Sequence, residues 1–169
     1  MVHTIHAQGT GKSFALKAAI TAARRVGRRV FVTASTGAAA TQIGGQTIHA
    51  FAGVGHAGES AADLARHVAS SYKAKKRWLA CETLVIDEIS MLDASTFDKL
   101  DHVARYVRGS DKPFGGVQLL CCGDFLQLPP VADPQVFGSM RKETDLRKMG
   151  QSGWDVFSDD IYVLDQMVR

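Results

Sequence analysis

The sequence predicts an α/β fold with a mainly parallel central sheet, and three observations support this class. Short apolar runs alternate along the chain with longer amphipathic segments, which is the pattern of βαβ units with right-handed crossovers. The apolar runs are continuous, as in strands buried on both faces of a parallel sheet. The length of 169 residues suits one domain with a substantial core.

Four apolar runs predict the strands of this sheet. They are "RRVFVTAS" (28–35), "TLVIDEIS" (83–90), "GGVQLLCCGD" (115–124) and "DIYVLDQ" (160–166). The N-terminal run "MVHTI" is short, and His3 and His6 are poor material for a buried first strand. The polar segment 131–153, with its Gly, Pro and Ser, predicts an irregular surface excursion.

Three segments predict helices. Residues 12–26 are rich in alanine and end before Gly27, and residues 93–108 carry acids early and arginines late, which matches the helix dipole. Residues 59–79 are amphipathic, with one apolar stripe of Leu64, Val68, Tyr72 and Leu79. The basic run Lys73, Lys75, Lys76 and Arg77 predicts a solvated helix face, beside which Tyr72 and Trp78 act as packing anchors.

Composition sets limits on the class of protein. Hydrophobic residues make up 46% and charged residues 22%, and the net charge of +3 is compatible with a nucleic-acid partner without proving one. No apolar run approaches a membrane span, so no membrane association is expected. Cys81, Cys121 and Cys122 are expected to be reduced, buried thiols in an intracellular compartment, and no Cys/His spacing indicates zinc.

A candidate phosphate-binding loop lies in "HAQGTGKSF" (6–14). Gly9, Thr10, Gly11, Lys12 and Ser13 supply the end of the pattern G-x-x-x-x-G-K-[ST]. Backbone N–H groups and the helix N-terminus would hold the phosphates, Lys12 would reach the β/γ-phosphates, and Ser13 would bind Mg²⁺. The alternative is an ordinary glycine-rich turn that begins a helix.

The opening glycine of this pattern would fall at position 6, where the sequence has His6. A Cβ there costs on the order of 1–3 kcal/mol if the backbone must stay in a glycine-only region. Such a cost would weaken ATP binding roughly ten- to hundredfold. We therefore expect a nucleotide site with an impaired entry, in which the helix still aims Lys12 and Ser13.

A second candidate element is "LVIDEIS" (84–90), an apolar strand that ends in two acids, as a Walker B motif does. Asp87 would bind the Mg²⁺ shell, and Glu88 would orient and deprotonate the attacking water. The alternative is a solvated strand end. The joint occurrence with the phosphate-loop pattern, in the right order, makes chance improbable.

Two further stretches carry candidate polar residues. In "CCGDFLQLPPV" (121–131), Gln127 follows a strand and would contact the γ-phosphate or the attacking water, unless it is a plain loop residue. The stretch 33–55 is rich in Ser, Thr and Gly, and His49 and Phe51 would project together if it were extended. Small hydroxyls suit phosphate contacts and rings suit base stacking, although close-packed turns and a core Phe51 give the same composition.

Together these stretches resemble the Pif-type DNA helicases of the superfamily-one, 5′-to-3′ branch. The residues that carry the resemblance are GTGKS (9–13), TASTGAAA (33–40), TIHAFAGVG (47–55), LVIDEISMLD (84–93), FDKLDHVARYVRGSDKPFGGVQLL (97–120) and GDFLQLPPV (123–131). The resemblance implies a three-layer RecA-like P-loop NTPase lobe over residues 1–169. It also implies ATP-dependent DNA unwinding in DNA repair, recombination and telomere or genome maintenance.

The resemblance also implies roles for individual residues. Lys12, Ser13, Asp87 and Glu88 keep the roles given above, and Gln127 becomes the γ-phosphate sensor. "LDQMVR" (164–169) is similar to the family's next motif, which makes Arg169 an arginine finger, although Gln166 and Met167 depart from the pattern. The residues in the motifs that contact single-stranded DNA are Thr33, Ser35, Thr36, Thr47, His49 and Phe51.

Several expectations about the whole protein follow from the resemblance. The cofactors are ATP and Mg²⁺, the partner is single-stranded DNA, and the chain is a monomer. The family's second motor lobe and the upstream adenine-contacting glutamine are missing from these residues, so weak ATP binding and little hydrolysis are expected. The compartment is the nucleus or mitochondrion in a eukaryote, and the cytoplasm otherwise. The alternative is a catalytically impaired lobe that only binds single-stranded nucleic acid or a partner.

Overall fold

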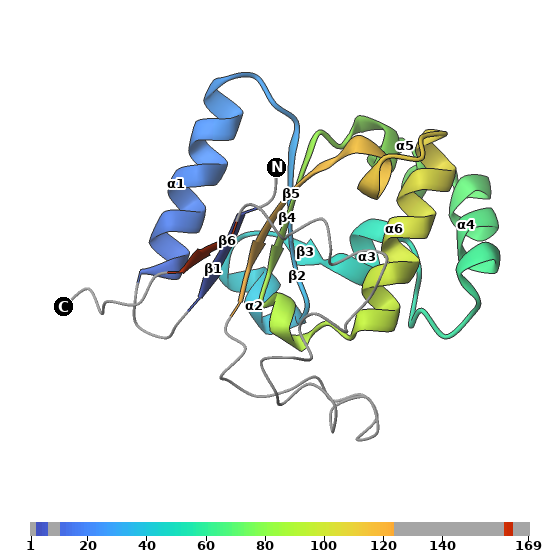
Figure 1. The fold of residues 1–169 in the computed structure, drawn as a ribbon, viewed down its shortest axis with the longest axis horizontal. Coiled ribbons are helices and arrows are strands. Elements are labelled where there is room, and N and C mark those ends of the chain that lie inside the picture. Colours follow the sequence, from blue (N-terminus) through green and yellow to red (C-terminus); the bar gives the residue numbers. More distant parts are fainter. Residues whose placement is uncertain (1–2, 7–10, 124–160, 164–169) are drawn as a thin grey trace.

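The computed structural model describes residues 3–6, 11–123 and 161–163, and it places helices on both faces of a parallel sheet (Figure 1). The six strands run in the order β3-β2-β4-β5-β1-β6, and each neighbouring pair is parallel. Their bounds are β1 His3–His6, β2 Val30–Ala34, β3 Gln46–Thr47, β4 Thr83–Asp87, β5 Gln118–Cys122 and β6 Ile161–Val163.

The described helices form the two outer layers. Helix α1 (Lys12–Arg25) covers one face, and α3, α4, α5 and α6 pack on the other (Figure 1). The bounds of the remaining helices are α2 Gly37–Gln42, α3 Ile48–Ala52, α4 Ala61–Ser70, α5 Tyr72–Ala80 and α6 Ala94–Arg108, with short 3₁₀ turns at Ile89–Met91 and Pro113–Gly116. The predicted three-layer α/β architecture is therefore confirmed.

The two cores follow from the alternation of side chains along buried strands. In β4, Val85 packs with Leu16 and Ile20 of α1, whereas Leu84 and Ile86 join the larger core on the opposite face. All five residues of β4 are buried, as the continuous apolar run predicted. Each Leu or Ile buried in this way contributes roughly 1.5–3 kcal/mol of hydrophobic free energy.

The first strand corrects an expectation of the sequence. β1 forms in spite of its two histidines, and it pairs with β5 on one side and β6 on the other. A strand that pairs along both edges forms backbone hydrogen bonds on both sides, whatever its side chains are. The partners of β1 in these bonds are distant from it in the sequence. His6 is the last residue of β1 and pairs with Val163.

The segment 59–79 also differs from its prediction, because it forms two helices instead of one. Ser71 has an extended backbone (φ −80°, ψ 107°), and its hydroxyl caps α5 by accepting the N–H of Ala74. The change of direction leaves Tyr72 77% exposed and buries Trp78 completely, so the predicted stripe holds for Leu64 and Val68 but not beyond them. Trp78 is the packing anchor that was predicted.

Two expectations about the surface of the protein remain, the lack of a membrane span and the polar segment 131–153. Among the described residues, no helix is long and apolar enough to cross a bilayer. The predicted surface excursion at 131–153 lies outside the described residues.

Candidate functional site

The candidate site lies at the edge of the sheet where the parallel strands end. Ala34 and Asp87 are register partners at the ends of β2 and β4, and the Ser35 N–H donates to the Asp87 carbonyl at 3.1 Å. Carboxyl ends of parallel strands are where ligands bind in folds of this type. Ser35 and the segment 87–88 are therefore brought together at this edge.

The N-terminus of α1 is built to leave its first turn available to an anion. Gly11 precedes the helix in the left-handed conformation (φ 83°, ψ 19°), and no side chain caps it. The first turn contains no acid, so no side chain of the helix itself offsets the positive end of its dipole. Lys12 is half-buried and Ser13 is exposed, while Gly9 and Thr10 lie outside the described residues.

The surroundings of the Cys122 thiol, at the end of β5, show that Lys12 lies near Asp87 and Glu88. Burial raises the pKa of this thiol to about 12; Asp87 and Glu88 raise it as well, and Lys12 opposes them. One small group thus lies within electrostatic reach of the Lys12 ammonium and both carboxylates, which come from two elements far apart in the sequence.

Asp87 is held rigidly at this position. Its side chain is nearly buried, and Oδ1 accepts the N–H of Glu88 at 3.0 Å. A carboxylate and a nearby hydroxyl such as that of Ser13 are the oxygen donors that Mg²⁺ prefers when phosphates and waters complete its shell. Among the described residues, no cluster of three or more His, Cys, Asp or Glu side chains could cage a metal by itself.

Glu88 adopts a strained backbone. It has φ 52° and ψ 45°, a left-handed conformation that costs a non-glycine residue roughly 1–2 kcal/mol. The Ser35 hydroxyl donates to the carbonyls of Asp87 and Glu88 and helps to hold this turn. Strain of this kind clusters at functional sites, because the surrounding structure must over-determine it.

Cys122 and Gly123 are site residues that the sequence analysis missed. A Cβ on Gly123 would lie 2.9 Å from Ile89 Cγ2 and 3.1 Å from the Ser90 nitrogen, so a larger residue would crowd the acidic turn where β5 leaves the sheet. The signal available in the sequence was the pair "CG" (122–123) near the end of the third apolar run. Gln127 and Arg169, by contrast, lie outside the described residues.

The residues predicted to contact single-stranded DNA divide into two groups, and the side chains of the first group, Thr33 and Phe51, are buried. Thr33 is fully buried, and its hydroxyl donates to the Val85 carbonyl. Phe51 is fully buried between Phe31 and Trp78, with ring centroids 5.3 and 5.0 Å away. Neither side chain is accessible to a ligand.

The second group lies nearer the surface. The hydroxyls of Thr36 and Thr47 cap α2 and α3 by accepting the N–H groups of Ala39 and Ala50, each at 3.2 Å. His49 is half-buried on α3, and because residues 48–52 are helical rather than extended it does not project together with Phe51. These caps fix the positions of two helix N-termini near the carboxyl edge of β2 and β3.

The environment of His49 favours the neutral form of its imidazole. Burial lowers the pKa of His49, and nearby His56 lowers it further, against an opposing effect of Asp93. A neutral ring can stack or share a hydrogen bond without the cost of burying a charge.

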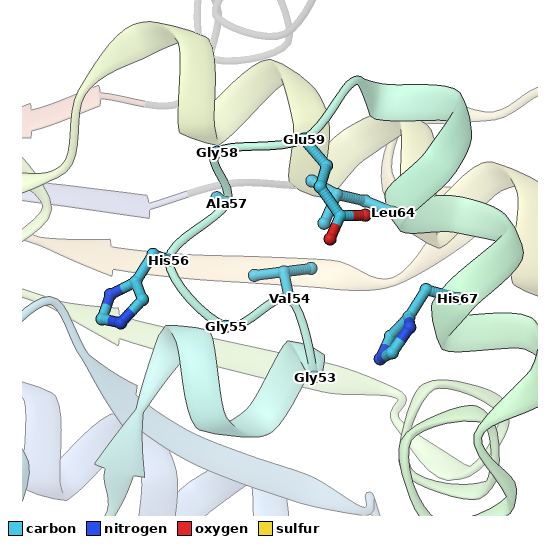
Figure 2. A pocket seen from close by; sticks show the side chains of 9 residues that line it. All are labelled: Gly53, Val54, Gly55, His56, Ala57, Gly58, Glu59, Leu64 and His67. Carbon is cyan, nitrogen blue, oxygen red and sulfur yellow. The ribbon is translucent and has the colours of Figure 1, made fainter.

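A hollow of about 320 Å³ lies next to α3 and is shown in Figure 2. The loop from Gly53 to Glu59 lines it together with Leu64 and His67. None of the predicted site residues lines this hollow, so the candidate nucleotide site lies elsewhere, at the converging charges around Cys122.

Comparison with known proteins agrees with this geometry. A model of the PIF1-like helicase family matches residues 2–154. The chain belongs to the PIF1-like helicase family. It is 54% identical over 125 residues to the human "ATP-dependent DNA helicase PIF1", covering 73% of this chain and 19% of that relative. The yeast protein of the same name (Saccharomyces cerevisiae strain YJM789) is 54% identical over 129 residues, covering 75% and 15%.

Solved PIF1-type structures share the fold. The Pif1 helicase from Candida albicans superposes with a TM-score of 0.82 at 37% identity, covering 99% of this chain and 36% of that one. Bacteroides sp Pif1 in complex with ADP-AlF4 gives a TM-score of 0.73 at 30% identity, covering 99% and 38%. Bacteroides Pif1 bound to ssDNA gives 0.70 at 30% identity, with the same coverage. The chain spans about a fifth of the curated relatives it matches.

Proposed function

We propose that residues 1–169 form one RecA-like lobe of an ATP-dependent DNA helicase, and that its nucleotide site is the carboxyl edge described above. The observation that carries the proposal is the shared surroundings of the Cys122 thiol, where Lys12, Asp87 and Glu88 act on one point. A cation and two acids beside an uncapped helix N-terminus suit a magnesium-bound triphosphate.

Each residue has a distinct task in this proposal. Lys12 neutralises the β- and γ-phosphates, and the first-turn N–H groups of α1 hold their oxygens. Ser13 and Asp87 supply oxygen ligands to Mg²⁺, whose charge stabilises the transferring phosphoryl group when it is bound. Glu88 accepts the proton of the attacking water. Gln127 and Arg169 are proposed as γ-phosphate contacts, by resemblance alone.

We infer that the backbone cost expected at His6 from its sequence position does not arise. As a strand residue in β1 it has extended backbone, which any side chain adopts, so the glycine-only cost does not apply. This favours a nucleotide-binding lobe over the alternative of a lobe that binds only nucleic acid. The complex of a Bacteroides relative with ADP-AlF4 supports the same choice.

Single-stranded DNA is proposed as the second partner, at the loops that follow β2 and β3. Ser35, Thr36, Thr47 and His49 are the contact candidates, and Thr33 and Phe51 support them from the core. The ssDNA-bound Bacteroides relative supports this choice. A nuclear, mitochondrial or cytoplasmic compartment is proposed from the free, buried state of the described cysteines.

The direct test is nucleotide binding by the 169-residue chain, measured with a fluorescent ADP in the presence of Mg²⁺. Lys12→Ala should weaken binding at least about tenfold, which corresponds to about 1.4 kcal/mol. Lys17→Ala is the matched control, because Lys17 is an exposed residue of the same helix. Equal affinities of Lys12→Ala and Lys17→Ala would refute the site.

A second measurement separates the two candidate functions. In a helicase lobe, ADP and Mg²⁺ change the affinity for single-stranded DNA, and Lys12→Ala removes that change. In a lobe that binds only nucleic acid, the affinity is the same with and without nucleotide in both proteins.

A further inference from the structure

The outer face of α5 is strongly basic and takes no part in the proposed nucleotide site. It presents Tyr72, Lys73, Lys75 and Lys76, all exposed, and we call these four residues the lysine face. The inner face of α5 is buried, with Ala74 and Trp78 in the core. The lysine face is therefore a surface on a well-anchored helix.

The lysine face differs from several other basic side chains of the described residues in its lack of ion pairs. Arg29, Arg66 and Arg105 form ion pairs with Glu82, Asp63 and Asp101 respectively. Over the part of the chain that the structure describes, Lys73, Lys75 and Lys76 form no such pair, and α5 itself contains no acidic residue. Their positive potential is directed to the solvent.

Helix stability does not explain this arrangement. Lys73 lies in the first turn of α5, where the helix dipole disfavours a cation, and no acid balances it. The preceding helix α4 follows the usual rule, with Asp63 in its first turn. A pattern that opposes local stability indicates a role outside the fold.

Tyr72 adds an exposed ring to the same surface. Its side chain is 77% exposed, and the Lys76 ammonium lies 5.8 Å from the ring centroid. The sequence had predicted a packing anchor here, and the structure assigns the ring to the surface. With Lys76 over it, this ring is not a free platform for a single-stranded base.

The backing of the lysine face is rigid. Arg77 Nε donates to the Phe51 carbonyl at 2.7 Å, and the Trp78 indole donates to the Ala52 carbonyl at 3.2 Å. Helix α5 ends at Ala80, and β4 begins at Thr83, so its last turn lies at the edge where the strands begin. That edge is opposite to the candidate nucleotide site.

We infer that the lysine face binds the phosphate backbone of duplex DNA, independently of base sequence. Unpaired lysines on a rigid helix match a polyanion, and duplex DNA offers one phosphate per about 1.7 Å of axis. The surface lacks the free aromatic rings of a single-strand platform. The inference rests on the proposed function only in taking DNA as the polymer.

The test is binding of a blunt random-sequence duplex to the 169-residue chain by fluorescence anisotropy, between 50 and 200 mM salt. The variant is the triple substitution Lys73→Gln, Lys75→Gln and Lys76→Gln. Log K falls with log salt, and each phosphate contact adds about 0.9 to the steepness of that fall. Loss of three lysine contacts should therefore make the slope shallower by about 2–3. The duplex affinity at the lower salt should fall at least about tenfold.

The control is the triple variant Lys17→Gln, Arg24→Gln and Arg25→Gln on α1, which removes the same charge from exposed positions of another layer. It should leave the slope unchanged. Equal losses in the two triple variants would show a plain net-charge effect and overturn the inference. An unchanged slope in the α5 variant would also overturn the inference. The lysine face would then be either a solvated surface or a binding site for an acidic protein.

Two further arms separate this inference from the proposed function. A single strand of the same length should lose less affinity than the duplex in the α5 variant; an equal loss would contradict the assignment to duplex DNA. Nucleotide binding should be unchanged in the α5 variant, and Lys12→Ala should retain duplex binding. Loss of duplex binding in Lys12→Ala would place the contact at the nucleotide edge instead.

Discussion

At the scale of single residues, the backbone of Glu88 is the point where fold and chemistry conflict. A residue in the left-handed region stores roughly 1–2 kcal/mol, and glycine would remove that cost. The sequence nevertheless places a carboxylate there, directly after the buried Asp87. We interpret the stored energy as the consequence of directing this side chain toward the site.

The first prediction compares two substitutions that both remove the carboxylate. Glu88→Gly should unfold with a free energy about 1 kcal/mol higher than Glu88→Ala, because only alanine retains the left-handed strain. Chemical denaturation of the two variants measures the difference. If Glu88→Ala is as stable as Glu88→Gly, the conformation at position 88 is not strained.

The second prediction concerns the pH dependence that His49 confers. Its pKa is lowered by burial, so the folded chain favours the neutral ring, and protonation favours the unfolded chain. The stability it contributes is present above the unfolded pKa of about 6.5 and is lost as the pH falls through the lowered, folded value. The melting temperature should therefore fall between pH 7.5 and pH 5.5, and fall less in His49→Gln. Identical falls in the two proteins would contradict this role.

At the scale of elements, α3 is held in place by side chains of α5. Arg77 donates to the carbonyls of Phe51 and Ala50 at the end of α3, at 2.7 and 2.9 Å. These bonds satisfy carbonyls that a helix end leaves without intrahelical partners. Helix α3 carries His49, so its placement governs the proposed contact with the single strand.

The third prediction is that Arg77→Ala lowers the free energy of unfolding by about 1–3 kcal/mol, since two charge-assisted hydrogen bonds are lost. Lys76→Ala, the neighbouring exposed position, should change it by less than about 0.5 kcal/mol. Thermal or chemical denaturation of both variants decides the point. A loss in Lys76→Ala as large as that in Arg77→Ala would show that the effect comes from net charge.

The elements also show which parts of the fold local sequence can predict. β4 and α6 were predictable because a continuous apolar run and a dipole-matched amphipathic segment are local signals. β1 was not, because its stability comes from ladders with β5 and β6 that lie more than a hundred residues away. The break at Ser71 was missed because the apolar spacing continues across it, while its capping hydroxyl decides the geometry.

At the scale of the whole molecule, the parallel sheet brings Lys12 and the pair Asp87–Glu88 to one edge. The motif spacing was sufficient to predict this, since the carboxyl ends of parallel strands always meet on one side. The sequence could not tell which hydroxyls serve the ligand and which the fold. Thr33 bonds across to β4 and Thr47 caps a helix, and both uses depend on contacts made only in the folded chain.

The fourth prediction follows from the burial of the thiols on both faces of the sheet. Burial raises the pKa of Cys81 and of Cys122 to about 12, and raises that of Cys121 as well. All three should resist alkylation by iodoacetamide at pH 8 and react only as fast as the chain unfolds. Mass spectrometry of the native chain over time measures this, and rapid labelling of any of the three would contradict the described core.

The central claim is that one nucleotide touches both the start of α1 and the end of β4. The most direct measurement is paramagnetic broadening of backbone amide NMR signals by ADP loaded with Mn²⁺ in place of Mg²⁺. The account predicts that the amides of residues 11–13 and 87–88 broaden together, with those of α5 unaffected. Broadening of one group without the other would contradict a shared site.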